Sequence, residues 1–366
     1  MSSSGVPDDD EDLHARVLAA LRRTAFLLER ELASTHRVKA FRGAATTVTG
    51  TPPAELARRV AEGSLEGLPG VGRTTAALVD DVAAGRPVAY LVELEERRQP
   101  LVAADDEGAA GGAALRAALR GDLHLHSDWS DGGSPVEDMA VTAVELGHAY
   151  AALTDHSPRL KVAHGLTPAR LRRQLELLDS LAAPLAPFRL LSGIEVDILS
   201  DGALDQEEEL LERLDVVVAS VHSELRMERG AMTRRMVRAV QDPRTDVLGH
   251  CTGRYVQPRE GVGRARPESE FDAAAVFAAC AEAGVAVEVN SRPERLDPPM
   301  RLLRQAVEAG CLFSVDTDAH APGQLDWQER GCARAARAGV PPERVVNTWP
   351  VEDLLAWTAD HAHRPA

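Results

Sequence analysis

Short apolar runs alternate with helical segments beyond residue 120, and this alternation restricts the fold more than any other feature of the sequence. Strands that are separated by helices pair in parallel within one sheet. Seven such repeats favour a closed or nearly closed barrel over an open sheet, so the predicted fold class is α/β. The runs expected to form strands cover residues 121–126, 149–154, 188–195, 215–220, 246–249, 285–289 and 311–316.

Helical spacing of apolar residues marks the segments between these runs and also a separate N-terminal part. We predict a disordered tail at 1–12, a small all-α domain at 13–100, a glycine-rich linker at 101–120 and the barrel domain at 121–366. Helices are expected at 13–32, 36–48, 53–62 and 73–84, and then in the barrel at 135–147, 167–182, 205–213, 230–241, 269–283 and 299–310.

Histidines and carboxylates gather at the C-terminal ends of the predicted strands. In a β/α barrel this end carries the loops that form active sites. His124 and His126 are two residues apart on one strand, so their side chains face the same way. A single histidine at a strand end is usually a packed polar residue, but a recurrence at six strand ends favours a metal centre. The candidate ligands are His124, His126, Asp131, His156, Glu195, His222, His250, Asp318 and His320.

The donor set contains nitrogen and oxygen without sulfur, which suits Zn²⁺, Mn²⁺ or Fe²⁺. Nine ligands exceed what one ion can bind, so two or three divalent ions are expected, with Glu195 able to bridge. Clustered divalent ions activate water and hold phosphate oxygens, so hydrolysis of a phosphate ester is the reaction that this set favours. Asp155 and Asp197 are expected to orient metal-bound histidines.

The motifs resemble those of the PHP (polymerase and histidinol phosphatase) family. They are His124-Leu-His126-Ser-Asp-Trp-Ser-Asp131-Gly, Thr-Asp-His156, Gly-Ile-Glu195, Ser-Val-His222, Gly-His250 and Asp318-Ala-His320. The resemblance implies a distorted seven-stranded barrel with three metal sites. One site would use His124, His126, Glu195 and Asp318; a second would share Glu195 and add His222 and His250; the third would use Asp131, His156 and His320. The predicted catalytic residues are Asp318, His320 and Glu195.

A second set of motifs is similar to the C-terminal PHP domain of bacterial family X DNA polymerases: Ala219-Ser-Val-His-Ser, Val247-Leu-Gly-His-Cys-Thr-Gly-Arg254 and Val287-Glu-Val-Asn290-Ser-Arg-Pro-Glu-Arg295. Arg254 and Arg295 follow strand ends and can clamp a phosphate, although surface roles are equally open. Asn290 ends the sixth strand, and His164 is placed at the mouth of the site. These four are the candidate substrate-binding residues.

The N-terminal domain contains the turn Leu68-Pro-Gly70-Val71-Gly72-Arg73, which is typical of a helix-hairpin-helix. Its glycines permit a tight backbone, and the N–H groups that begin the next helix can face a DNA phosphate. Gly70, Val71, Gly72 and Arg73 are therefore the predicted DNA contacts. The surrounding sequence is similar to the DNA-end-binding domain of the same polymerases. The segment 100–120 is too short for a polymerase palm.

Charge is distributed unevenly along the chain, whose net charge is −16. Residues 13–100 carry 13 basic against 10 acidic residues, whereas residues 121–366 carry 26 against 39. The overall balance argues against a protein that coats nucleic acid. No apolar run is long enough to span a membrane, and the start resembles neither a signal nor a transit peptide, so the cytoplasm is the expected location.

Three functions follow as hypotheses. The first is a phosphoesterase of DNA 3′ ends, as a 3′–5′ exonuclease or 3′-phosphatase in DNA repair, which holds DNA through residues 13–100. The second is a small-molecule phosphatase of the histidinol-phosphatase type. The third is a non-catalytic DNA-binding adaptor, against which the full ligand set argues. A separate polymerase or repair partner is also conceivable because the palm is missing.

Overall fold

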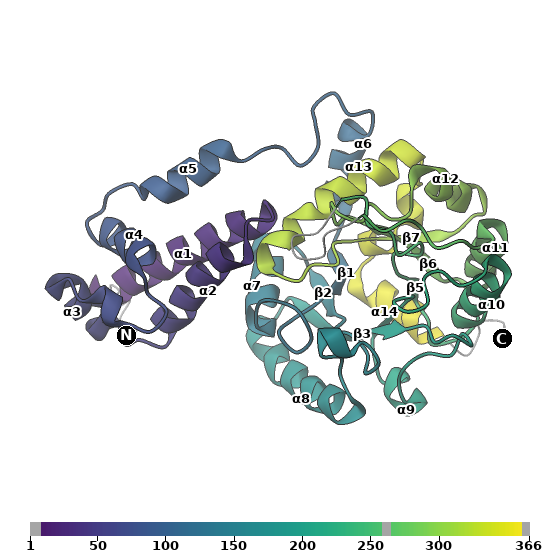
Figure 1. Ribbon diagram of the computed structural model, residues 1–366, viewed down its shortest axis with the longest axis horizontal. Helices are drawn as coiled ribbons and strands as arrows, with labels where there is room; N and C mark the ends of the chain where they lie inside the picture. Colours follow the sequence, from purple (N-terminus) through teal and green to yellow (C-terminus); the bar gives the residue numbers. More distant parts are fainter. Residues whose placement is uncertain (1–8, 258–264, 361–366) are drawn as a thin grey trace, which may run out of the picture. The chain divides into compact units, whose positions relative to one another are not determined.

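The computed structural model describes residues 9–257 and 265–360 (Figure 1). Contacts within the chain divide it into two compact units, one ending at Pro100 and the other beginning at Leu101. The first unit ends at the residue where the predicted helical domain ends, and the second unit includes the segment predicted as a linker.

The second unit is built on seven parallel strands whose order in the sheet follows the chain. Five predicted runs contain a whole strand, whereas the runs 188–195 and 285–289 overlap strands that continue to Asp197 and Asn290. Buried parallel strands are apolar on both faces, and β4 illustrates this with Val-Val-Val-Ala-Ser. The strands are β1 (Gly121–Leu125), β2 (Tyr150–Leu153), β3 (Arg189–Asp197), β4 (Val216–Ser220), β5 (Val247–Leu248), β6 (Ala286–Asn290) and β7 (Leu312–Asp316).

Helices follow the strands and cover the outside of the sheet (Figure 1). On β4, Val217 and Ala219 pack with residues of these helices, whereas Val216 and Val218 pack with Leu123 in a separate inner cluster. The barrel helices are α7 (Val136–Glu145), α8 (Pro168–Leu185), α9 (Glu208–Leu211), α10 (Arg229–Val240), α11 (Ala273–Ala283), α12 (Met300–Glu308), α13 (Gln328–Ala338) and α14 (Val351–Ala359). The last two were not predicted.

The first and last strands meet, which brings the barrel close to closure. Leu125 forms a parallel bridge with Ala319, and the backbone N–H of His126 donates to the carbonyl of Ala319 at 2.8 Å. The register of β1 against β2 shifts between Asp122 and Leu125. His124 therefore lies at an irregular part of β1, and His126 directly follows the strand, beside the segment after β7.

The segment predicted as a linker at 101–120 contains helix α6 (Ala109–Ala118). This helix packs against α13 so closely that a Cβ added at Gly112 would lie 2.6 Å from the Cα of Ala333. Asp106, just before the helix, pairs with Arg337 at 3.2 Å. The glycines that suggested a loose connection are needed for close helix packing.

The first unit consists of helices around its own core. Val17 and Leu21 on the first helix pack with Phe41 and Leu78 in a cluster separate from those of the barrel. The helices are α1 (Asp9–Arg30), α2 (Thr35–Thr49), α3 (Pro53–Glu62), α4 (Arg73–Ala83) and α5 (Ala89–Arg97). The predicted disordered tail at 1–12 is wrong for residues 9–12, which form the first turn of α1. All four are acidic, and acidic side chains near the N-terminus stabilise a helix through its dipole. Residues 1–8 lie outside the described part.

The cysteines form no disulfide, because all four are buried free thiols. Within the described ranges, every helix is too short or too polar to cross a bilayer.

Candidate metal centre

Nine side chains from the C-terminal ends of six strands lie in one connected cluster, here called the metal centre. They are the nine predicted ligands, which are separated by up to 196 positions in the chain. The side chain of Asp131 is 31% exposed, and those of His222 and His320 are 10% exposed. The remaining six are more deeply buried.

Glu195 lies in the middle of this cluster. Its Oε2 atom is 2.8 Å from Nδ1 of His156 and 3.4 Å from Nε2 of His124. Its Oε1 atom is 2.8 Å from Nε2 of His250 and 3.2 Å from Nε2 of His222. A carboxylate with histidines on both oxygens has the geometry of a bridging ligand.

Asp131 and Asp318 also lie close to histidines of the metal centre. Oδ1 of Asp131 is 3.4 Å from Nε2 of His156 and 3.3 Å from Nε2 of His320. Oδ1 of Asp318 is 3.5 Å from Nε2 of His126.

There are three sets of residues in which the donor atoms lie within 4.8 Å of one another, and each set could hold a cation. Their membership differs from the implied grouping. His126 also joins the Asp131 set, and His156 joins the Glu195 set. Glu195 is not grouped with His124, and His250 belongs to none of the three sets. The sets are His126, Asp131, His156 and His320; His124, His126 and Asp318; and His156, Glu195 and His222.

Buried donors and acceptors of the metal centre lack hydrogen bonds within the described residues. They include both carboxylate oxygens of Glu195 and both ring nitrogens of His126, His222 and His250. Buried polar groups are almost always satisfied in native proteins, so this concentration requires a ligand. Divalent cations would satisfy the nitrogen and oxygen atoms together, and the donor set therefore fits metal ions.

The electrostatics keep the two central carboxylates ionised. Burial alone would raise the pKa of Glu195, but His222 and His124 outweigh it and hold that pKa well below the usual value. Burial is likewise outweighed at Asp318, where the charge of Arg295 and the approach of His126 at 3.5 Å hold the pKa well below its usual value. Both groups are therefore anionic at neutral pH, as metal ligands must be.

Carboxylates behind the metal centre hold its histidines. Asp197 accepts a hydrogen bond from the backbone N–H of His222 at 3.1 Å and lies 3.7 Å from the ring Nδ1, so it fixes the main chain of this residue. Orientation of the ring by Asp197 stays a prediction. Asp155 contacts the loop and not a histidine: it accepts hydrogen bonds from Ser127 and from Gln174. Its role is to fix the loop that carries Asp131.

Glu288 was missed by the sequence reasoning. Its Oε1 lies 2.6 Å from Nδ1 of His124, and its Oε2 accepts from the backbone N–H of His250 at 2.5 Å. The signal was available, since Glu288 is a fully buried acid in the otherwise apolar run Ala-Val-Glu-Val.

The predicted substrate-binding residues separate into two groups. Arg295 and Asn290 reach the metal centre: Nε of Arg295 donates to Oδ2 of Asp318 at 2.9 Å, and Nδ2 of Asn290 lies 3.2 Å from the same oxygen. Arg254 donates instead to the carbonyl of Arg295 at 3.0 Å and lines a neighbouring pocket. His164 is exposed on the loop after His156.

The predicted DNA-binding turn adopts the expected sharp conformation. Gly70 has a φ of +72°, and helix α4 begins at Arg73 directly after Gly72. The side chain of Val71 packs into the core of its unit with 6% exposure, so only its backbone is available to a ligand. Contact with DNA stays a prediction.

Comparison with known families identifies the barrel. Residues 122–292 match the family model described as the PHP domain. Residues 122–292 form a PHP domain. This confirms both the resemblance and the predicted fold class.

One relative of the PHP domain is the "DNA polymerase/3′-5′ exonuclease PolX" of Bacillus subtilis, which is 36% identical over 239 residues. The match covers 65% of this chain and 41% of that protein, so the chain spans about two fifths of that relative's length. Another is a "Probable phosphatase" of Syntrophotalea carbinolica, 27% identical over 241 residues, covering 62% of this chain and 90% of that protein.

A solved structure is also similar: histidinol phosphate phosphatase of Lactococcus lactis in complex with zinc, L-histidinol and phosphate. It covers 60% of this chain and 94% of its own, with 19% identity and a TM-score of 0.42.

Proposed function

We propose that this chain hydrolyses phosphate esters at the 3′ ends of DNA, with residues 13–100 holding the DNA. Metal-dependent phosphoester hydrolysis is the activity of the PHP domain. The step to DNA is supported by the PolX relative, whose printed name is that of a polymerase and 3′–5′ exonuclease. It is also supported by the glycine turn at 70–72 in a unit with a slight basic excess.

The single observation that carries the proposal is the set of buried, unbonded donors around Glu195. The three sets of donors would hold two or three divalent ions of zinc, manganese or iron. Bound there, such ions polarise a phosphoryl oxygen and lower the pKa of water.

The chain's own residues orient the substrate and manage the proton. Arg295 is buried beside Asp318, and its Nη1 atom has no hydrogen-bond partner within the described residues, so it can donate to a phosphate oxygen. Asn290 lies against the same carboxylate and fixes its orientation. Asp318 and His320, whose Nδ1 lies 3.5 Å from Oδ1 of Asp318, are the groups placed to accept a proton from water.

A second candidate is a small-molecule phosphatase. The acidic barrel favours it, as does the Syntrophotalea relative, of which this chain covers 90%. In this case the N-terminal unit would serve another purpose.

The test is an activity assay on the purified chain loaded with Mn²⁺ or Zn²⁺. A 5′-labelled DNA that carries an accessible 3′ end, with or without a 3′-phosphate, is compared with histidinol phosphate and with a generic phosphomonoester, and Asp318→Ala controls for contaminating nuclease. Stepwise 3′ shortening or 3′-phosphate release that Asp318→Ala abolishes is the expected result. Phosphate release from small esters with intact DNA would support the second candidate and overturn the first. Inertness toward all three substrates, with DNA binding retained, would leave the adaptor hypothesis.

A further inference from the structure

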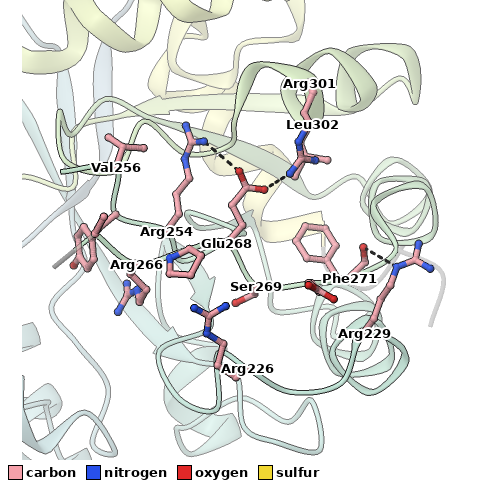
Figure 2. Close-up of a pocket in the computed structure, with 14 residues that line it drawn as sticks. Arg226, Arg229, Arg254, Val256, Arg266, Glu268, Ser269, Phe271, Arg301 and Leu302 are labelled. Atoms are coloured by element: carbon pink, nitrogen blue, oxygen red, sulfur yellow. Dashed lines mark hydrogen bonds and ion pairs between the residues drawn. The ribbon is translucent and has the colours of Figure 1, made fainter. Parts of the chain in front are cut away.

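A pocket of about 730 Å³ opens on the C-terminal side of the barrel strands. Its walls come from the segments that follow β4, β5 and β6, and thus from the same end of the barrel as the metal centre. Five arginines line it: Arg226, Arg229, Arg254, Arg266 and Arg301 (Figure 2). We call it the arginine pocket.

The arginine pocket reverses the charge of its surroundings. The barrel domain carries 39 acidic against 26 basic residues, yet only Glu268 and Glu270 oppose the five arginines in this lining. Arg254 and Arg301 both point to Glu268, which they share (Figure 2). The pocket therefore keeps an excess of positive charge.

Arg226 is the arginine most open to a ligand. It is exposed, and within the described residues it forms neither a hydrogen bond nor an ion pair. Arg229, by comparison, lies 3.3 Å from Asp272. A guanidinium held at the wall of a pocket without a partner is suited to an anion that arrives from solution.

Ser269 gives an independent indication of a ligand. The residue lines the arginine pocket with 6% exposure, and its Oγ atom has no hydrogen-bond partner within the described residues. Its backbone is fixed, because its N–H donates to the carbonyl of Thr252 at 2.9 Å. A buried hydroxyl without a partner is costly unless something binds to it.

One side chain connects the arginine pocket to the metal centre. The ring of Tyr255 lies under the guanidinium of Arg266 at 4.3 Å and under that of Arg295 at 4.8 Å. Arg295 in turn donates to Asp318. When the terminal phosphate of a nucleic-acid strand lies at the metal centre beside Arg295, the next phosphates of that strand would therefore lie toward the arginine pocket.

We propose that the arginine pocket binds the phosphodiester backbone of single-stranded nucleic acid leading to the metal centre. This inference rests on the proposed function, since it assumes a substrate longer than one nucleotide. Two guanidinium groups already lie over the ring of Tyr255, so this ring is not free to stack on a base. The pocket would contact a strand through its arginines and the Ser269 hydroxyl. Recognition should therefore be independent of sequence and sensitive to salt.

The test measures binding by the metal-loaded full chain to a fluorescent phosphorothioate oligothymidylate of about ten nucleotides, within the usual site size for single strands. Arg226→Glu is compared with Arg173→Glu, which makes the same charge change at an exposed position on α8 outside the pocket. Arg226→Glu should weaken binding roughly tenfold, the effect of losing a charged hydrogen bond. It should also lower the slope of log affinity against log salt by about 0.7. Arg173→Glu should bind like the wild type.

Ser269→Ala supplies a second measurement. It should weaken binding several-fold without lowering the thermal midpoint, because it removes a hydroxyl that no other residue uses.

Equal affinities for Arg226→Glu and Arg173→Glu would overturn the proposal. So would equally tight binding of thymidine monophosphate or inorganic phosphate, which would identify a free phosphate compound as the ligand. Binding is measured apart from hydrolysis, so a chain that binds the strand through Arg226 but cleaves no DNA would contradict the proposed function alone.

Discussion

Glu288 and His124 form a buried pair in which the carboxylate Oε1 lies 2.6 Å from the ring Nδ1. Burial would lower the pKa of His124, but the charges of Glu288 and Glu195 raise it well above its usual value. The contact between Glu288 and Nδ1 fixes the ring of His124, so that its Nε2 faces Oε2 of Glu195 at 3.4 Å. Glu288 is a positioning residue for the metal centre.

We expect Glu288→Gln to weaken metal binding about 10- to 100-fold, the usual effect of losing a carboxylate behind a ligating histidine. The measurement is calorimetric titration of the metal-free chain with Zn²⁺ or Mn²⁺. Glu282→Gln, an exposed position on α11, is the matched control and should bind as the wild type does. Equal affinity for the two variants would show that Glu288 does not position His124.

Asp155 should be required for the loop that carries Asp131. Its carboxylate accepts hydrogen bonds from the Ser127 N–H at 2.9 Å, the Ser127 hydroxyl at 2.6 Å and Gln174 at 2.6 Å. Asp155→Ala leaves these buried donors unpaired and should lower the free energy of unfolding by about 2–4 kcal/mol.

Urea unfolding followed by tryptophan fluorescence is the measurement, because all four tryptophans lie in the barrel unit. Asp179→Ala, an exposed position on α8, is the control and should change stability little. A loss below about 0.5 kcal/mol for Asp155→Ala, the range of surface substitutions, would refute the role assigned to it.

His148 should make the barrel sensitive to acid. Burial and, second, the nearby Arg116 lower the pKa of His148 to about 3, so the folded protein holds it neutral. The unfolded chain takes up this proton near pH 6.5, which means that stability is lost as the pH falls from about 6.5 toward 3. At pH 4 the loss from this group should be about 3 kcal/mol.

His148→Gln should therefore flatten the decline of stability between pH 7 and pH 4. The measurement is the urea midpoint at each pH. His164→Gln, at an exposed position in the same unit, should keep the wild-type slope. Parallel curves for the wild type and His148→Gln would contradict this prediction.

A substitution at Gly72 can test DNA binding without disturbing the fold. A Cβ added there meets no atom within 4 Å, whereas Gly70 has a positive φ that strains any other residue. Gly72→Ala should keep the thermal midpoint and weaken binding to a gapped duplex several-fold, because the methyl group stands where a phosphate would approach the start of α4. Gly70→Ala should destabilise the unit by about 1 kcal/mol. Unchanged binding by Gly72→Ala at low salt would argue against a DNA-binding turn.

The strands were predictable because buried parallel strands leave continuous apolar runs, as at β4, which was expected at 215–220 and spans Val216–Ser220. The ligand candidates were predictable for a related reason, since polar residues at the ends of such runs share one end of the barrel. The grouping of donors was less accessible, because it depends on side-chain directions: His156 meets Glu195 through one ring nitrogen and Asp131 through the other.

The remaining differences have physical causes. Helix α6 contains Gly111 and Gly112, which suggest a loop when read locally, but tertiary packing against α13 selects glycine there. Glu288 is marked in the sequence as an acid inside an apolar run, but the run does not reveal its partner His124, 164 positions away.

The junction of β1 and β7 also governs when the metal centre can assemble. His126 comes from the start of the barrel sequence and Asp318 from its last strand, and the bridge between Leu125 and Ala319 brings them together. A chain still emerging from the ribosome has the histidines of β1 long before it has their β7 partners. Loop closure over so long a segment is entropically costly and slow. Completion of the centre and closure of the barrel therefore both depend on the last strand and the segment after it, and a chain truncated before β7 would lack both.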